Sequence, residues 1–194
     1  MKKELDELLC KRYPKMMVNR NKGMQETCMC WGFECGDGWF NILDQLMGNI
    51  QHRIDWKEKQ RESAIKYNEI VTQCQAGNFE SFEKEYAGLN TEYKDKRLAE
   101  IIAGGRRELP ELIPQVTLDQ VKEKFGTLRF YYTGGDDAID GMVTMAESMS
   151  GVTCEECGNP GKRVGGGWVT TICTEHAEAR GIYTSREDDL NDAT

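Results

Sequence analysis

The sequence predicts an α+β fold, in which helices pack on a small antiparallel β-hairpin or sheet and a compact module follows. Three observations support this prediction: helical periodicity over residues 37–54, two adjacent strand-like segments over residues 115–133, and a closing segment, 152–180, with few large apolar side chains. A chain of 194 residues can hold one sizeable core or two small ones. We therefore expect an α+β body at residues 1–151 and a separate module at residues 152–180.

The N-terminal part of the body is predicted to contain one short and one long helix. Residues 2–13 carry a short apolar stripe that ends near Pro14, and residues 19–38 look irregular. Asp37 stands where a helix N-cap belongs. Behind it, apolar residues recur at three- and four-residue steps, which predicts an amphipathic helix through residue 54. These apolar residues are Trp39, Ile42, Leu43, Leu46, Ile50 and Ile54.

Residues 55–108 are predicted to form a peripheral helical insert without a core of its own. Helical spacing weakens after residue 54 and stops at Gly77-Asn78. Residues 79–103 are highly charged and carry only thin apolar stripes, which indicates two short helices.

The second half of the body is predicted to be a β-hairpin followed by a helix. Residues 115–124 and 127–133 are strand-like and are joined through Gly126. Asp136 is expected to cap a helix that ends at Gly151. Met142, Met145 and Met149 lie on or near one face of this helix, and we interpret them as core residues and not as a binding groove.

Two residue pairs near the C-terminal end have the spacing of a zinc site. Cys154 and Cys157 are separated by two residues, and after fifteen further residues Cys173 and His176 repeat that gap. Zinc prefers four nitrogen or sulfur ligands in a tetrahedron, and two chelating pairs supply them. Because four protein ligands leave no position for water, the sequence predicts one structural Zn2+ ion in a zinc-ribbon-like module.

Composition bounds the location and the partners of the chain. It has no apolar run long enough to span a membrane and no secretory signal at its start, so we expect a cytoplasmic protein. Its eight cysteines then read as metal ligands or buried thiols and not as disulfides. The net charge of −8 disfavours nucleic acid as a partner without excluding it. The acidic segment 185–194 is expected to be disordered.

Two further groups of residues leave alternatives open. Cys28, Cys30 and Cys35 could form a second metal site, although a one-residue gap chelates less naturally and burial of the thiols explains them as well. Asp136, Asp137 and Asp140 could hold a metal in a hydrolase, but helix capping is the more common role of such residues.

One basic surface is predicted beside aromatic residues of the hairpin. Cations of the hairpin and of the C-terminal module could meet phosphates, and hairpin aromatics could stack bases, although strand aromatics more often serve a core. The residues concerned are Lys122, Lys124, Arg129, Tyr131, Lys162 and Arg163.

Three segments together resemble a known protein family. These are CMCWGFECGDGWFNIL at 28–43, QVKEKFGTLRFYYTGGDDAIDGMVTMAESMS at 120–150 and CEECGNPG…GGGWVTTICTEHA at 154–177. The chain resembles a family of uncharacterised bacterial, phage and prophage proteins with a Lys-Glu-Lys-Phe-Gly-x-Leu-Arg-Phe-Tyr-Tyr segment followed by a zinc knuckle. The resemblance implies a small accessory protein in a bacterial host cytoplasm, and it implies no particular activity.

These observations lead to one functional hypothesis and two alternatives. No nucleophile elbow or phosphate-binding loop is present, and the sequence contains only two histidines, His52 and His176. We hypothesise a non-enzymatic accessory binding protein that engages a host protein or a nucleotide-like ligand. The alternatives are a nucleic-acid-binding protein that uses residues 115–133 and the zinc module, and a metal-dependent hydrolase that uses the three aspartates.

Overall fold

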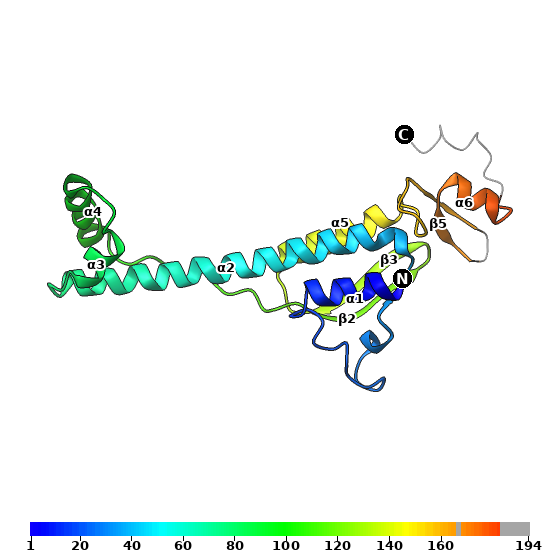
Figure 1. Ribbon diagram of the computed structural model, residues 1–194, viewed down its shortest axis with the longest axis horizontal. Coiled ribbons are helices and arrows are strands. Elements are labelled where there is room, and N and C mark those ends of the chain that lie inside the picture. The colour runs from blue at the N-terminus through cyan, green and yellow to red at the C-terminus, as the bar shows by residue number, and fades with distance from the viewer. Residues whose placement is uncertain (166–167, 183–194) are drawn as a thin grey trace. The chain divides into compact units, whose positions relative to one another are not determined.

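The computed structural model describes residues 1–165 and 168–182 and divides into two compact units (Figure 1). Unit 1 comprises Met1–Arg53 with Pro114–Thr194, and unit 2 comprises Ile54–Ile113. The domain boundaries expected from the sequence, at residues 151 and 152, stay a prediction. The acidic segment 185–194 lies outside the described residues.

Unit 1 has the predicted α+β fold, with helices, a small sheet and a C-terminal hairpin. Its elements are α1 (Lys3–Arg12), the 3-10 helices η1 (Cys28–Trp31) and η2 (Asp37–Trp39), β1 (Phe33–Glu34), the first part of α2 (Phe40–Gln75), β2 (Thr117–Lys124), β3 (Thr127–Thr133), α5 (Asp137–Ser150), β4 (Lys162–Val164), β5 (Thr170–Ile172) and α6 (Thr174–Ala179). Figure 1 shows α5 running alongside the first part of α2.

The predicted hairpin is confirmed, and a third strand that was not predicted from the sequence extends it. β2 and β3 pair antiparallel, with Val121 opposite Phe130, and Gly126 turns between them with φ 78°. β1 adds to the free edge of β2 in parallel, with Phe33 beside Val121. A strand of two residues has no alternation to detect, so it could not be predicted from its own sequence.

The core of unit 1 draws buried residues from α2, the sheet and α5. Trp39, Leu43, Met47 and Ile50 of η2 and α2 are buried at the helical spacing predicted for this segment. β2 and β3 contribute Leu118, Val121, Leu128 and Phe130, and α5 contributes Ile139, Val143 and Ala146. Burial of these side chains is the main driving force for folding of this unit.

One helix cap was predicted correctly and another was not. Asp136 caps α5, since its side chain accepts a hydrogen bond from the backbone N–H of Ile139. Asp37 does not cap α2, which begins at Phe40 after a 3-10 turn. The carboxylate of Asp37 instead accepts the backbone N–H of Lys2 at 2.7 Å and pairs with its ammonium group at 3.0 Å. The carboxylate of Asp37 is therefore occupied by Lys2 and does not cap α2.

The interpretation of the α5 methionines as core residues was wrong. Met145 is 64% exposed and Met149 is 45% exposed. Together with Met142 they line an apolar groove of about 290 Å³ whose other wall is α2, including Ile42 and Leu46. Helical periodicity identifies the apolar stripe, but it cannot show that a neighbouring helix covers only part of it.

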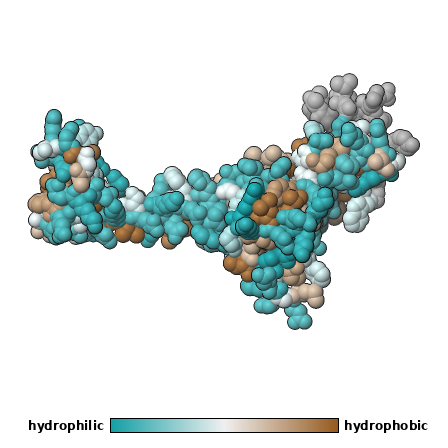
Figure 2. Space-filling view, in the orientation of Figure 1, coloured by the Kyte–Doolittle hydropathy of each residue, from teal (hydrophilic) through white to brown (hydrophobic). Residues whose placement is uncertain are grey.

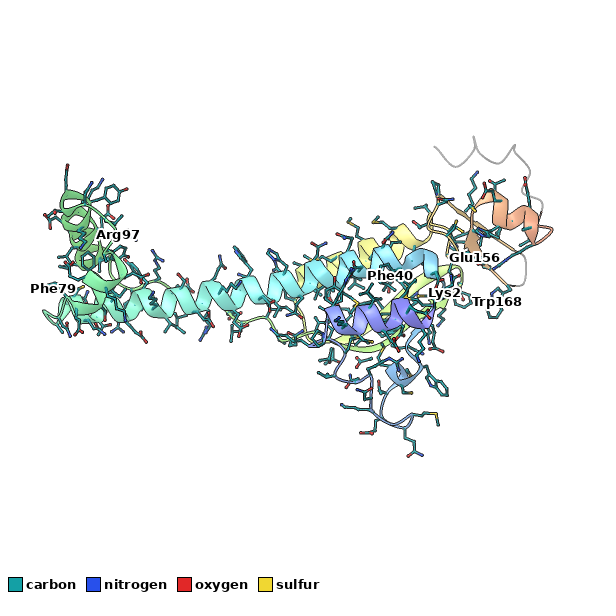
Figure 3. The ribbon with its side chains drawn as sticks, in the orientation of Figure 1. Lys2, Phe40, Phe79, Arg97, Glu156 and Trp168 are labelled. Carbon is teal, nitrogen blue, oxygen red and sulfur yellow. The ribbon has the colours of Figure 1, made fainter. Side chains whose placement is uncertain are left out.

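Unit 2 has a small core, contrary to the expectation from its sequence. The end of α2 meets α3 (Glu80–Glu85) and α4 (Thr91–Gly104). Their thin stripes combine into one buried cluster of Ile70, Val71, Cys74, Phe82 and Ile101. Arg97, labelled in Figure 3, lies within 6.0 Å of the rings of Tyr67 and Tyr86. Each stripe was too narrow to suggest a core, and only their convergence forms one.

The face of the molecule shown in Figure 2 is largely hydrophilic, with separate apolar patches. None of the helices in the described part of the chain combines the length and the apolar character that crossing a membrane requires.

Candidate metal centre

The four predicted zinc ligands come together at the C-terminal end of unit 1. Cys154 and Cys157 lie on the turns that follow α5, while Cys173 precedes the first residue of α6 and His176 lies within this helix. One ligand atom from each of the four lies within 4.8 Å of the other three. In the described residues, 1–165 and 168–182, this is the one group of three or more acidic, cysteine or histidine side chains arranged to hold a metal ion.

The distances within this cluster suit a single ion. The sulfur atoms of Cys157 and Cys173 are 3.8 Å apart. Nδ1 of His176 lies 3.5 Å from the sulfur of Cys154 and 3.1 Å from that of Cys173. Sulfur and nitrogen atoms this close, on side chains from two separate segments, define a cluster that can hold one metal ion.

Local backbone geometry explains why the first pair of cysteines points inward. Gly158 adopts φ 78°, and its N–H donates to the carbonyl oxygen of Cys154, closing the turn. The N–H of Cys154 donates in return to the carbonyl oxygen of Asn159. A glycine meets the positive φ of such a turn without steric strain, so its place after Cys157 was an informative sequence signal.

The surroundings of Cys154 lower the pKa of its thiol. Burial opposes the charged form of Cys154, but hydrogen bonds from the backbone N–H groups of Cys173, Cys157 and Glu156 lower the pKa of its thiol to about 7. The pKa of Cys157 is raised to about 11, although the N–H of Asn159 favours its thiolate, because burial and the neighbouring cysteines oppose a second negative charge. The cluster therefore releases its first proton near neutrality and holds the next one tightly.

A carboxylate outside the ligand set orients the histidine. Nε2 of His176 lies 3.3 Å from Oε2 of Glu156, and Glu156 also pairs with Arg180. Contacts with the thiols of Cys173 and Cys154 raise the pKa of His176. Because Nδ1 faces the thiols and Nε2 faces a carboxylate, the ring is fixed in the orientation that ligation through Nδ1 requires. Sequence reasoning missed Glu156, although its place between two ligand cysteines was visible.

The turn that carries Cys154 and Cys157 packs against residues 36–39 of the N-terminal segment of unit 1. The N–H of Gly38 donates to the carbonyl oxygen of Glu155 at 2.8 Å, and the N–H of Gly36 donates to the carboxylate of Glu155 at 2.9 Å. Nε1 of Trp39 donates to the carbonyl oxygen of Thr153 at 2.8 Å. A Cβ on Gly38 would overlap the Cys154 carbonyl and lie 2.8 Å from the amide nitrogen of Cys157. Only glycine allows this approach, and sequence reasoning did not detect the contact.

The second metal site left open at Cys28, Cys30 and Cys35 is not formed by these residues. Cys28 is exposed, the thiol of Cys30 donates to the carbonyl oxygen of Thr27 at 3.2 Å, and Cys35 is buried. Burial raises the pKa of Cys35 to about 12. These thiols do not converge, and the alternative interpretation as buried thiols is correct for Cys35 and wrong for Cys28.

The three aspartates at the start of α5 also have other roles. Asp136 accepts from both Nε and a terminal nitrogen of Arg53, at 3.0 and 2.7 Å, which lowers the pKa of its carboxyl. Asp140 accepts from the hydroxyl of Tyr132. Asp137 lies in the first turn of the helix.

All six residues of the predicted basic surface lie on β2, β3 and β4, but one of them, Arg129, faces a carboxylate. Lys122 lies over the ring of Tyr131, and Arg163 reaches the tip of the β2–β3 hairpin. Lys162 and Arg163 are neighbours on β4, and Lys124 ends β2. Arg129 instead lies 3.7 Å from Glu147 on α5.

A scan against protein-family models found no match to this chain. Searches of curated proteins and of solved structures likewise found no significant similarity.

Proposed function

We propose that this chain is a non-enzymatic binding protein whose C-terminal module is held together by one structural zinc ion. The observation that carries the proposal is the closed cluster of Cys154, Cys157, Cys173 and His176. Three soft sulfur donors and one imidazole form a ligand set that proteins use for zinc.

The spacing of the donors supports zinc over larger or harder ions. A tetrahedral ion with zinc–sulfur bonds of about 2.3 Å places its sulfur ligands about 3.8 Å apart. The sulfurs of Cys157 and Cys173 have this separation. Magnesium and calcium prefer six or more oxygen ligands, which this cluster does not supply.

A site with four protein ligands serves the fold and not a reaction. Catalytic zinc sites keep a coordination position for water or substrate, whereas structural sites fill all four with side chains. The module has a small core of its own, made of Cys154, Ile172, Cys173 and Ala177. So little apolar burial needs another source of stability, and zinc can contribute on the order of 10 kcal/mol.

The resemblance to phage and prophage proteins motivates the rest of the proposal. An accessory protein of that kind would act in the cytoplasm of a bacterial host and would engage a host protein or a nucleotide-like ligand. The hydrolase alternative has lost its motivation, because Asp136 is engaged by Arg53 and by the cap of α5.

A turnover assay tests the non-enzymatic part of this proposal. Zinc-loaded protein, with and without added magnesium, is incubated with phosphodiester, phosphomonoester and nucleoside triphosphate substrates. We expect no turnover above that of a buffer blank. Hydrolysis that requires magnesium and disappears in Asp140→Asn would refute the proposal and restore the hydrolase alternative.

A further inference from the structure

Aromatic rings and cations lie along the β2–β3 hairpin and at its contact with the metal-binding module. We call this set the aromatic–cation row and define it as Tyr131, Lys122, Lys124, Phe125 and Arg163. The Lys122 ammonium lies 5.6 Å from the centre of the Tyr131 ring, and the Lys124 ammonium lies 5.5 Å from that of Phe125. Arg163 donates to the carbonyl oxygen of Phe125 at 2.7 Å. Each cation therefore lies beside an aromatic residue of the row.

The row lies on the face of the sheet that the core does not use. Val121 and Phe130 pair across the two strands and are both buried. Side chains alternate between the faces of a strand, so Lys122 and Tyr131 point to the opposite side. Tyr131 is 42% exposed there. The alternative reading of the hairpin aromatics as core residues is therefore correct for Phe130 and wrong for Tyr131.

The tip of the hairpin carries an exposed aromatic ring on a residue with positive φ. Phe125 has φ 54°, a left-handed conformation that a bulky side chain rarely adopts, and it is 64% exposed. Phe125 and Gly126 are the two central residues of the hairpin turn, and a two-residue turn with positive φ at both positions is a common hairpin connection. The turn therefore accounts for the backbone conformation of Phe125, and the exposed ring is the feature that a ligand could contact.

The lysines of the row are available to an anion. Within the described residues, Lys122 and Lys124 lie over aromatic rings and form no ion pair with a carboxylate. The nearby acidic side chains are engaged elsewhere. Glu123 accepts from the N–H of Gly126, Glu34 accepts from Gln120, and Glu147 accepts from the N–H of Phe130.

We infer that the aromatic–cation row binds single-stranded nucleic acid, with bases stacked on Tyr131 and Phe125 and phosphates beside Lys122, Lys124 and Arg163. The inference rests on the non-enzymatic binding role of the proposed function and names single-stranded nucleic acid as the ligand in place of a host protein or a nucleotide-like molecule. Exposed rings alternating with cations are complementary to a chain of unpaired bases linked by phosphates, whereas paired bases in a duplex cannot reach the rings. The overall charge of −8 makes this a local and salt-sensitive interaction.

A further exposed ring lies in the metal-binding module. Trp168 is 80% exposed, and in Figure 3 it projects away from the ribbon of the module. Its neighbour Val169 meets Gly126 at the hairpin tip, where a Cβ on the glycine would lie 3.1 Å from the valine side chain. Val169 thus brings the metal-binding module into contact with the hairpin tip.

Fluorescence anisotropy with zinc-loaded full-length protein and a labelled oligothymidylate of about twelve nucleotides tests the inference. Three cations against phosphates predict a slope of about −2 for the logarithm of affinity against the logarithm of salt concentration. The double variant Lys122→Gln/Lys124→Gln should reduce this slope to about −0.7. Tyr131→Leu should weaken binding roughly tenfold at every salt concentration.

Unit 2 offers matched controls, because Lys57 lies 6.0 Å from the ring of the exposed Trp56. Lys57→Gln/Lys59→Gln and Trp56→Leu remove the same charge and the same kind of ring, and they should leave affinity and slope unchanged. The inference would be overturned if the oligonucleotide did not bind, or if the control variants lost as much affinity as the variants of the row. It would also be overturned if a duplex bound with equal affinity, or if a mononucleotide at the same concentration displaced the oligonucleotide. Recovery of intact oligonucleotide separates the two proposals, because degraded oligonucleotide would refute the non-enzymatic function itself.

Discussion

Two cysteine-rich regions of unit 1 reach opposite outcomes. Residues 28–35 hold three thiols within eight positions, yet one is exposed, one donates to a carbonyl group and one is buried alone. Cys154, Cys157 and Cys173 come from segments fifteen residues apart, yet they meet His176 within 4.8 Å. Density of cysteines in the sequence therefore predicts a metal site less well than two pairs that each have a two-residue gap.

The largest expected effect is loss of one converging thiol. Cys173→Ser removes a ligand from a module whose stability depends on the metal, so the module should unfold and lose on the order of 10 kcal/mol of binding free energy. Cys28→Ser is the matched change in the other region and should leave stability unchanged, because that thiol is exposed. Circular dichroism melts with and without a chelator measure both. If the two variants lost the same stability, the account of one metal-binding and one non-binding cysteine region would be wrong.

A smaller effect is expected where residues 36–38, which follow the first region, contact the C-terminal cluster. Gly38→Ala would place a methyl group against the backbone of Cys154 and Cys157, so the contact must open. We expect a loss of about 3 kcal/mol in the free energy of unfolding, measured by urea denaturation.

Gly141→Ala is the control for that substitution, since nothing lies within 4 Å of its Cβ position in α5. It should be neutral or stabilising by up to about 1 kcal/mol, as alanine favours a helix. If Gly38→Ala were as well tolerated, the packing of the cluster against residues 36–38 would not contribute to stability.

Zinc affinity should fall as the pH falls, because protons compete with the ion for the thiolates. The pKa of Cys157 is raised to about 11, so one proton must leave this thiol throughout the neutral range. The pKa of Cys154 is about 7, so a second proton adds to the cost mainly below neutrality. From about pH 8 to about pH 6, affinity should drop at least hundredfold, measured by competition with a chromophoric chelator. An affinity independent of pH would exclude thiolate ligation.

The smallest effect concerns the residue that orients the imidazole. Glu156→Gln keeps the shape of the side chain but removes the charge beside Nε2 of His176. We expect zinc affinity to fall about tenfold while the fold persists. Glu175→Gln makes the same change at a residue of α6 that forms no ion pair with the cluster in the described part of the chain, and it should have no effect. A loss shared by both variants would indicate a general electrostatic effect instead of orientation.

The sequence could predict what depends on local spacing. The paired gaps of Cys154, Cys157, Cys173 and His176 fixed the candidate ligands, and the alternation on either side of Gly126 fixed the hairpin. Asp136 was recognisable as a cap because its partner, the N–H of Ile139, is three residues away.

What depends on distant partners could not be predicted. β1 exists because Phe33 pairs with Val121. Asp37 does not cap α2 because its carboxylate binds Lys2. The exposure of Met145 reflects how far α2 covers α5, and the role of Gly38 reflects the position of Cys154. Each outcome is set by a residue far away in the chain, which periodicity along one element does not report.

Native mass spectrometry of the purified chain tests the central claim most directly, because it counts bound zinc ions on intact protein. We predict one zinc ion per chain, retained in the triple variant Cys28→Ser/Cys30→Ser/Cys35→Ser and lost in Cys173→Ser. Zinc that is retained without Cys173, or that disappears from the triple variant, would contradict the assignment of the metal to the C-terminal cluster.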